Sequence, residues 1–224
     1  WGTATAAHQI EGNNVNSDWW DFEQKHRPPD KRSGPADDSY NRYEEDFRIA
    51  KDLNLNAQRI SIEWARIEPE NGKFDAMQIE HYRQVLQSLK AKHFTVMLTM
   101  WHFTLPKWVA DIGGWENPLT GEYFIRLLKE VVPAFDEYVD FWITLNEPGV
   151  YVFMSYLRGT WPPQKKSKLS ATNVHWNLTR AHRQAYDLLH TLSRKPVGIA
   201  QNMQSFHSSH KHSLENSSIN VKTF

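Results

Sequence analysis

The sequence contains no cysteine, and this absence excludes several classes of protein at once. Without a thiol the chain can form no disulfide framework, no thiolate zinc site and no cysteine nucleophile. It also lacks a surplus of either charge, because 26 lysines and arginines balance 26 aspartates and glutamates. Nucleic acids and anionic membranes attract basic surpluses, so we expect neither as a partner. A run of about 18 apolar residues, which would predict a membrane-spanning helix, is also missing.

Tryptophan, in contrast, is abundant, with 10 residues among 224. Charged residues at 23% and hydrophobic residues at 40% are otherwise typical of a globular protein. The excess of tryptophan has two interpretations. It can indicate a large aromatic core, or a sugar site in which flat rings stack on the C–H faces of pyranose rings.

We interpret both ends of this sequence as cut from a longer chain. The chain begins at Trp1 in strand-like sequence, and its last twenty residues are largely polar. We therefore expect a single domain over residues 1–224 that is the N-terminal part of a longer protein, truncated at both ends. Because no signal peptide is visible and cysteine is absent, the expected compartment is the cytoplasm.

Strands and helices are predicted to alternate along the chain. Segments rich in β-branched and aromatic residues predict five strands, at Trp1–Ala7, Ala57–Trp64, Phe94–Trp101, Val139–Leu145 and Pro196–Asn202. Apolar residues at helical spacing predict four helices, at Ser39–Leu53, Gln78–His93, Gly121–Tyr138 and Asn173–Leu192. We expect Pro133 to bend or split the third helix.

This alternation is typical of βαβ units with a parallel sheet. A glycine-rich phosphate loop does not follow the first strand, which disfavours a dinucleotide-binding domain. The sequence therefore predicts an α/β fold that is a partial (β/α)₈ barrel, with about five strands and four helices of the eight. Three long segments rich in aromatic residues, at Gly12–Asp37, Phe103–Thr120 and Gly149–Thr172, are expected to form ordered walls of a site.

Polar side chains occur at the ends of all five predicted strands, where the chemistry of such barrels lies. Taken singly, each of them is more often a satisfied buried polar group. Together, at the ends of consecutive strands, they indicate a pocket for a polyol. The residues are Gln9, Arg59, His102, Asn146, Glu147 and Asn202.

The motifs around these residues resemble, in order, those of glycoside hydrolase family 1, which contains β-glucosidases and β-galactosidases. The most specific is the Asn-Glu-Pro motif in Thr144–Pro148, which resembles the acid/base motif of that family. Trp1–Gly12, Arg59–Pro69 and Trp101–Pro106 resemble its first three strands. The resemblance implies a retaining glycosidase that hydrolyses O-linked β-D-glycosides or oligosaccharides without a cofactor.

The resemblance also implies a role for each residue at the strand ends. Glu147 would be the general acid and then the general base, and Arg59 would orient the nucleophilic carboxylate. Asn146 would bind the sugar 2-hydroxyl. The remaining substrate-binding residues would be Gln9 and His102 at the 3- and 4-hydroxyls, Trp101 and Asn202 at the pocket, and Trp161 at an outer sugar or aglycone site.

A second carboxylate is not identified in this sequence. Retaining glycosidases need two carboxyl groups roughly 5–5.5 Å apart. In the family the nucleophile is a glutamate in a Glu-Asn-Gly motif at the seventh strand, and we interpret Glu70-Asn71-Gly72 here as a turn. The alternatives are a catalytically inactive sugar-binding remnant, or one chain of a split barrel whose partner is the missing C-terminal half.

Two groups of histidines have a spacing that can occur in metal sites. His8 precedes Glu11 by three residues, but this pair fits the first strand of the family better. His207, His210 and His212 lie in a polar segment that we interpret as a solvated loop. We expect no metal site.

Overall fold

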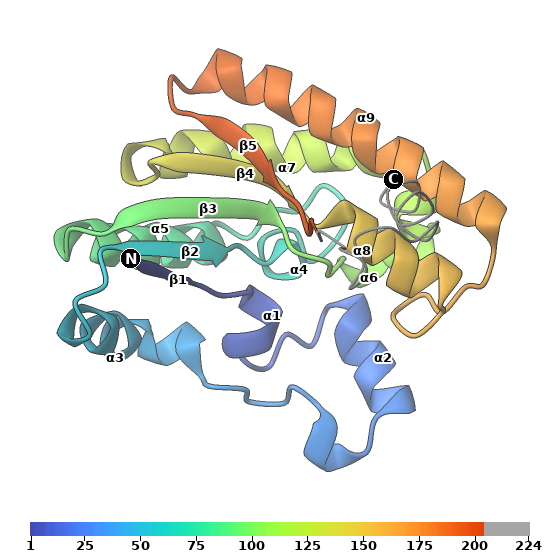
Figure 1. Ribbon diagram of the computed structural model, residues 1–224, viewed down its shortest axis with the longest axis horizontal. Coiled ribbons are helices and arrows are strands. Elements are labelled where there is room, and N and C mark those ends of the chain that lie inside the picture. Colours follow the sequence, from blue (N-terminus) through green and yellow to red (C-terminus); the bar gives the residue numbers. More distant parts are fainter. Residues whose placement is uncertain (204–224) are drawn as a thin grey trace, which may run out of the picture.

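A computed structural model describes residues 1–203 of the chain and shows one parallel sheet with helices packed against it (Figure 1). The sheet has five strands in the order β1-β2-β3-β4-β5, and each strand is parallel to the next. The strands are β1 Gly2–Ala4, β2 Ala57–Ser61, β3 Thr95–Trp101, β4 Phe141–Asn146 and β5 Val197–Ala200. Sequential strands are therefore neighbours in space, as in a (β/α)₈ barrel, and the predicted partial barrel is confirmed.

Four long helices connect the strands, as predicted. They are α3 Ser39–Asp52, α5 Ala76–Ala91, α7 Thr120–Phe135 and α9 Lys168–Leu192. The carboxylate of Asp75 caps α5 by accepting hydrogen bonds from the backbone N–H groups of Met77 and Gln78. Pro133 does not split α7, because it lies in the last turn and the helix ends two residues later.

Helix α9 begins earlier than the sequence pattern predicts. The hydroxyl of Ser167 accepts a hydrogen bond from the backbone N–H of Ser170 and so caps the helix, which begins at Lys168, five residues before Asn173. At 25 residues α9 is the longest helix that the structure describes. Neither α9 nor any other helix within residues 1–203 is long and apolar enough to cross a membrane.

Short helices occupy the segments that follow the strands and, in one case, the segment that precedes β4. They are α1 Ala7–Ile10, α2 Asp18–His26, η1 Pro29–Lys31, α4 Trp64–Ile67, α6 Lys107–Asp111, η2 Gly114–Glu116, η3 Asp136–Tyr138, α8 Pro148–Val152 and η4 Phe153–Leu157. The first two strands are consequently shorter than predicted. Each is followed by a four-residue helix, and a helix this short leaves too few residues to show a helical period.

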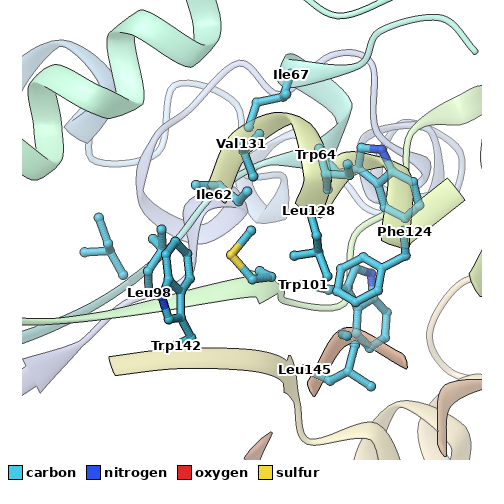
Figure 2. Close-up of a cluster of buried hydrophobic side chains, with 14 of the residues drawn as sticks. Ile62, Trp64, Ile67, Leu98, Trp101, Phe124, Leu128, Val131, Trp142 and Leu145 are labelled. Carbon is cyan, nitrogen blue, oxygen red and sulfur yellow. The ribbon is translucent and has the colours of Figure 1, made fainter. Parts of the chain in front are cut away.

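The core lies between the sheet and the helices that cover its outer face (Figure 2). Leu98 and Trp142 from the strands pack with Leu128 and Val131 of α7 in one continuous cluster. Four of the ten tryptophans are fully buried: Trp64, Trp101, Trp115 and Trp142. Much of the tryptophan excess therefore serves the core.

Truncation of a core leucine should be far more costly than truncation of an exposed one. Leu128 on α7 is 0% exposed, whereas Leu169 on α9 is 73% exposed. We expect Leu128→Ala to lower the free energy of unfolding by about 2–5 kcal/mol, because it leaves a cavity. The matched control Leu169→Ala should change it by less than about 0.5 kcal/mol. Urea denaturation of the protein that contains this chain measures both, and equal losses would contradict this description of the core.

Candidate active site

The carboxyl ends of the parallel strands meet at one edge of the sheet, where α1, α4, α6 and α8 gather (Figure 1). The predicted site residues come from these ends. Arg59 lies on β2 and Asn146 ends β4. His102 follows β3 directly, and Glu147 follows β4.

Arg59 joins three neighbouring strands through its guanidinium group. Its Nε donates a hydrogen bond to Oγ1 of Thr99 on β3 at 2.9 Å, and its Nη2 donates one to Oδ1 of Asn146 on β4. Thr99 is fully buried and Asn146 is 3% exposed. The guanidinium is therefore held in one orientation between β3 and β4, near their carboxyl ends.

A β-bulge in β4 lets Asn146 reach Arg59. The register with β5 changes between Ile143 and Asn146, so that β4 has one extra residue there. Between these two positions, Thr144 faces the helices and contacts Nδ1 of His182 on α9 at 2.7 Å. Regular alternation would place Asn146 on the same face as Thr144. The extra residue instead aims Asn146 at Arg59 on the opposite face.

Glu147 has a backbone conformation that residues other than glycine rarely adopt. Its φ is 44° and its ψ is 54°, in the left-handed region, and its backbone N–H donates a 2.7 Å hydrogen bond to the carbonyl of Ala200 on β5. Non-glycine residues in this region cost about 1–3 kcal/mol each and cluster at active sites. The half-buried Glu147 carboxyl lies near Arg59. Burial lowers the pKa of Arg59, and the charge of Glu147 opposes this shift.

His102 has a neutral imidazole near neutral pH. Burial and, to a smaller extent, the positive charge of Arg59 together lower its pKa to about 4. Its Nδ1 is buried and has no hydrogen-bond partner within residues 1–203. A neutral imidazole has one ring nitrogen that donates and one that accepts a hydrogen bond, so its accessible edge can bind a hydroxyl group.

Three aromatic side chains from different segments form one wall beside His102. The ring centroid of Phe103 lies 5.0 Å from that of Trp161 and 5.0 Å from that of His102. The ring of Trp19 lies 5.3 Å from that of Trp161, edge to face. All three rings are half-buried. We call Trp19, Phe103 and Trp161 the aromatic wall.

Trp101 lies beneath this wall. It is 1% exposed, its indole N–H donates a 2.9 Å hydrogen bond to the carbonyl of Thr104, and it packs edge-on against Trp115 and Tyr151. Phe103, which the sequence analysis did not single out, is the aromatic residue of this segment that reaches the wall. Two signals pointed to it: its position directly after His102, and its place at the start of Phe103–Thr120, a segment expected to form a wall of the site.

Gln9 and Asn202 lie farther from these contacts. Gln9 is exposed in α1 and Asn202 is exposed just beyond β5. Among the hydrogen bonds of the described residues, none joins either side chain to another predicted site residue. The structure thus brings Arg59, His102, Asn146 and Glu147 together, with Trp161 in the wall beside them.

A buried ionic network joins the segment after β1 to α4 and α5. Glu11 binds Nε of Arg66 at 2.9 Å and accepts hydrogen bonds of 2.9 and 3.0 Å from the hydroxyl of Tyr82. Burial raises the pKa of Glu11 to about 7, although Arg66 pulls it in the opposite direction. His8 binds Glu23 at 3.4 Å rather than Glu11.

Three further carboxylate or histidine patterns occur in the sequence: His8 with Glu11, the three histidines after residue 206, and Glu70-Asn71-Gly72. Within residues 1–203, no three histidine, aspartate or glutamate side chains are arranged to hold a metal ion. His207, His210 and His212 lie outside the described residues. Glu70 is exposed and binds Nζ of Lys73 at 2.6 Å across a turn.

The sequence model of Glycosyl hydrolase family 1 matches residues 1–222. The chain belongs to this family. It is 33% identical over 217 residues to β-glucosidase A of Acetivibrio thermocellus, covering 92% of this chain and 48% of that protein. It is also 33% identical over 180 residues to a chloroplastic galactolipid galactosyltransferase of Arabidopsis thaliana, covering 71% of this chain and 29% of that protein.

Solved structures in the family have the same fold. A β-glycosidase from Pyrococcus horikoshii superposes with a TM-score of 0.90 at 36% identity, covering 98% of this chain and 51% of that one. A β-glucosidase from Thermotoga maritima in complex with deoxynojirimycin gives a TM-score of 0.90 at 31% identity, covering 99% and 52%. The chain thus spans about half the length of the three glycosidases named here and less than a third of the galactosyltransferase.

The raised pKa of Glu11 predicts a pH dependence of stability. A carboxyl whose pKa rises from 4.5 to about 7 on folding binds its proton more tightly in the folded state. The free energy of unfolding should therefore fall as the pH rises through this range, and Glu11→Gln should flatten that part of the curve. Glu70→Gln, at an exposed carboxylate, is the control and should leave the slope unchanged. Urea titrations at several pH values measure the slope.

Proposed function

We propose that the protein containing this chain hydrolyses O-linked β-D-glycosides with retention of configuration, and that Glu147 is its general acid and base. The observation that carries the proposal is the position of Glu147: half-buried, in a strained conformation at the end of β4, beside Arg59 and Asn146. Membership of a family with β-glucosidase relatives supports this assignment.

The reaction takes place in two displacements. In the first, the protonated carboxyl of Glu147 donates its proton to the glycosidic oxygen while a second carboxylate attacks the anomeric carbon, and the aglycone leaves as an alcohol. In the second, ionised Glu147 takes a proton from water, whose oxygen attacks the anomeric carbon and releases the second carboxylate. Each step conserves charge without a cofactor.

The second carboxylate is proposed to come from a part of the protein that this chain does not contain. In the Glu-Asn-Gly sequence at Glu70 the carboxylate is exposed on a turn and paired with Lys73, which supports this proposal. Arg59 would hold the second carboxylate ionised and oriented. Its Nε and Nη2 are bound to Thr99 and Asn146, so the guanidinium cannot rotate away.

The other polar groups are proposed to bind the sugar hydroxyls. Asn146 would contact the 2-hydroxyl, an interaction that strengthens in an oxocarbenium-like transition state. His102, whose pKa is lowered to about 4 so that its imidazole is neutral, would bind the 3- or 4-hydroxyl together with Gln9. Asn202 would lie at the edge of the pocket.

The aromatic residues are proposed to divide their roles between the sugar and its support. Trp161, in the aromatic wall, would contact an outer sugar or the aglycone. Trp101 would shape the pocket through its buried contacts beneath the wall.

Transfer of the glycosyl group to an alcohol is a second candidate activity. One relative that is 33% identical is a galactosyltransferase, and the first displacement would be common to hydrolysis and transfer. The two activities differ only in whether water or an acceptor hydroxyl takes the glycosyl group. Analysis of products in the presence of added alcohols or glycolipids distinguishes them.

Replacing the proposed acid should affect poor leaving groups most. Glu147→Gln should lower kcat/KM for an alkyl β-glucoside by about 10²–10⁴-fold, because the leaving alkoxide then receives no proton. A dinitrophenyl β-glucoside, which leaves without protonation, should lose much less in its first displacement. Glu137→Gln, at an exposed glutamate before the opposite end of β4, is the control. Equal losses for both leaving groups would refute the acid role.

The contact of Asn146 with the 2-hydroxyl can be tested with a modified substrate. Asn146→Ala should lower kcat/KM for an aryl β-glucoside by about tenfold or more, since it removes a hydrogen bond made in the transition state. The 2-deoxy analogue lacks that hydroxyl, so its kcat/KM should change little. A similar loss for both substrates would place the effect of Asn146 in the orientation of Arg59 instead.

A further inference from the structure

Asp18, the first residue of α2, binds the segment that follows β3. Its Oδ1 accepts a 2.8 Å hydrogen bond from the backbone N–H of Leu105, and its own backbone N–H donates a 2.9 Å bond to the carbonyl of Leu105. The same Oδ1 also accepts the backbone N–H of Trp19 at 2.8 Å. One carboxylate oxygen thus holds segments that follow two different strands.

The bound segment carries His102 and Phe103 and has a strained backbone. Phe103 has a φ of 73°, in the left-handed region that an aromatic residue rarely adopts. The backbone N–H of Thr104 donates a 3.0 Å bond to the carbonyl of His102, closing a tight turn. The segment therefore needs external contacts to keep this shape.

Glu63 holds the same segment from the side of β2. The Thr104 hydroxyl lies 2.9 Å from each carboxylate oxygen of Glu63, which is 1% exposed. Asp18 and Glu63 therefore hold adjacent residues, Leu105 and Thr104. Glu63 also caps α4, so its replacement would disturb that helix as well as the segment.

We infer that Asp18 is a positioning residue for the proposed glycosidase: through Leu105 and Trp19 it sets the position of His102 and of the aromatic wall relative to the sugar. The inference rests on the proposed function for the role of His102. It adds a residue that touches no substrate but aligns two of the segments that form the pocket.

The function of Asp18 depends on an oxygen acceptor rather than on a negative charge. Burial raises the pKa of Asp18 to about 7, so its surroundings favour the neutral form. Its Oδ1 nevertheless accepts two backbone hydrogen bonds, as an asparagine Oδ1 would. Asp18→Asn should therefore preserve positioning, whereas Asp18→Ala removes the acceptor.

Asp21 provides a matched control on the same helix. Its carboxylate binds Nζ of Lys107 on α6 at 2.7 Å, so it joins the same two regions at the surface. Asp21→Ala breaks this ion pair without altering the backbone contacts of Leu105. It therefore reports the effect of a weakened α2–α6 contact alone.

The experiment compares these three variants of the protein that contains this chain. With an aryl β-glucoside, Asp18→Ala should lower kcat/KM by about 10- to 100-fold, and Asp18→Asn and Asp21→Ala by less than about threefold. With the 3-deoxy or the 4-deoxy analogue, whichever lacks the hydroxyl that His102 binds, the loss in Asp18→Ala should shrink. Amide hydrogen exchange of residues 102–106 should accelerate only in Asp18→Ala.

The outcomes separate this inference from the proposed function. An active wild type with unchanged kcat/KM in Asp18→Ala, or with the same loss on all three substrates, overturns the positioning role. A wild type that turns over no β-glycoside overturns the proposed function, and with it the role in sugar positioning. The exchange of residues 102–106 still shows in that case whether Asp18 holds the segment.

Discussion

The guanidinium group of Arg59 is the interaction on which the rest of the site depends. It reaches from β2 to Thr99 on β3 and to Asn146 on β4, and it carries a positive charge into a half-buried position. That charge contributes to keeping His102 neutral and lies near Glu147. A neutral hydrogen-bonding imidazole and a carboxyl group are thereby placed around one cation, an arrangement suited to binding hydroxyls and to moving a proton.

Two strained residues at the strand ends are held by contacts from elsewhere in the fold. Glu147 and Phe103 both have positive φ values, of 44° and 73°. Glu147 is held by the hydrogen bond of its N–H to Ala200 and by the start of α8, and Phe103 by the contacts of Thr104 and Leu105. Such conformations persist only where the surrounding structure over-determines them. The short helices after the strands therefore contribute to the site as well as to the core.

The alternation of strand and helix signals was sufficient to predict the architecture. Each of the five strand segments and four long helices occurs where apolar periodicity and turn residues indicated, with errors at their ends. The ends are the least predictable part, because Ala7 and Trp64 begin four-residue helices too short to show a helical period in the sequence. The hydroxyl of Ser167 likewise starts α9 earlier than its apolar stripe does.

The sequence by itself determined that polar residues end each parallel strand, and parallel strands place such ends together because all their carboxyl termini point the same way. That much predicts the meeting of Arg59, His102, Asn146 and Glu147. Only the tertiary structure decided which face each side chain takes. The bulge in β4 turns Asn146 toward Arg59. A strained turn buries Trp101 and places Phe103 in the aromatic wall. Both outcomes depend on contacts between residues far apart in the chain, such as Asp18 with Leu105, and no local pattern encodes them.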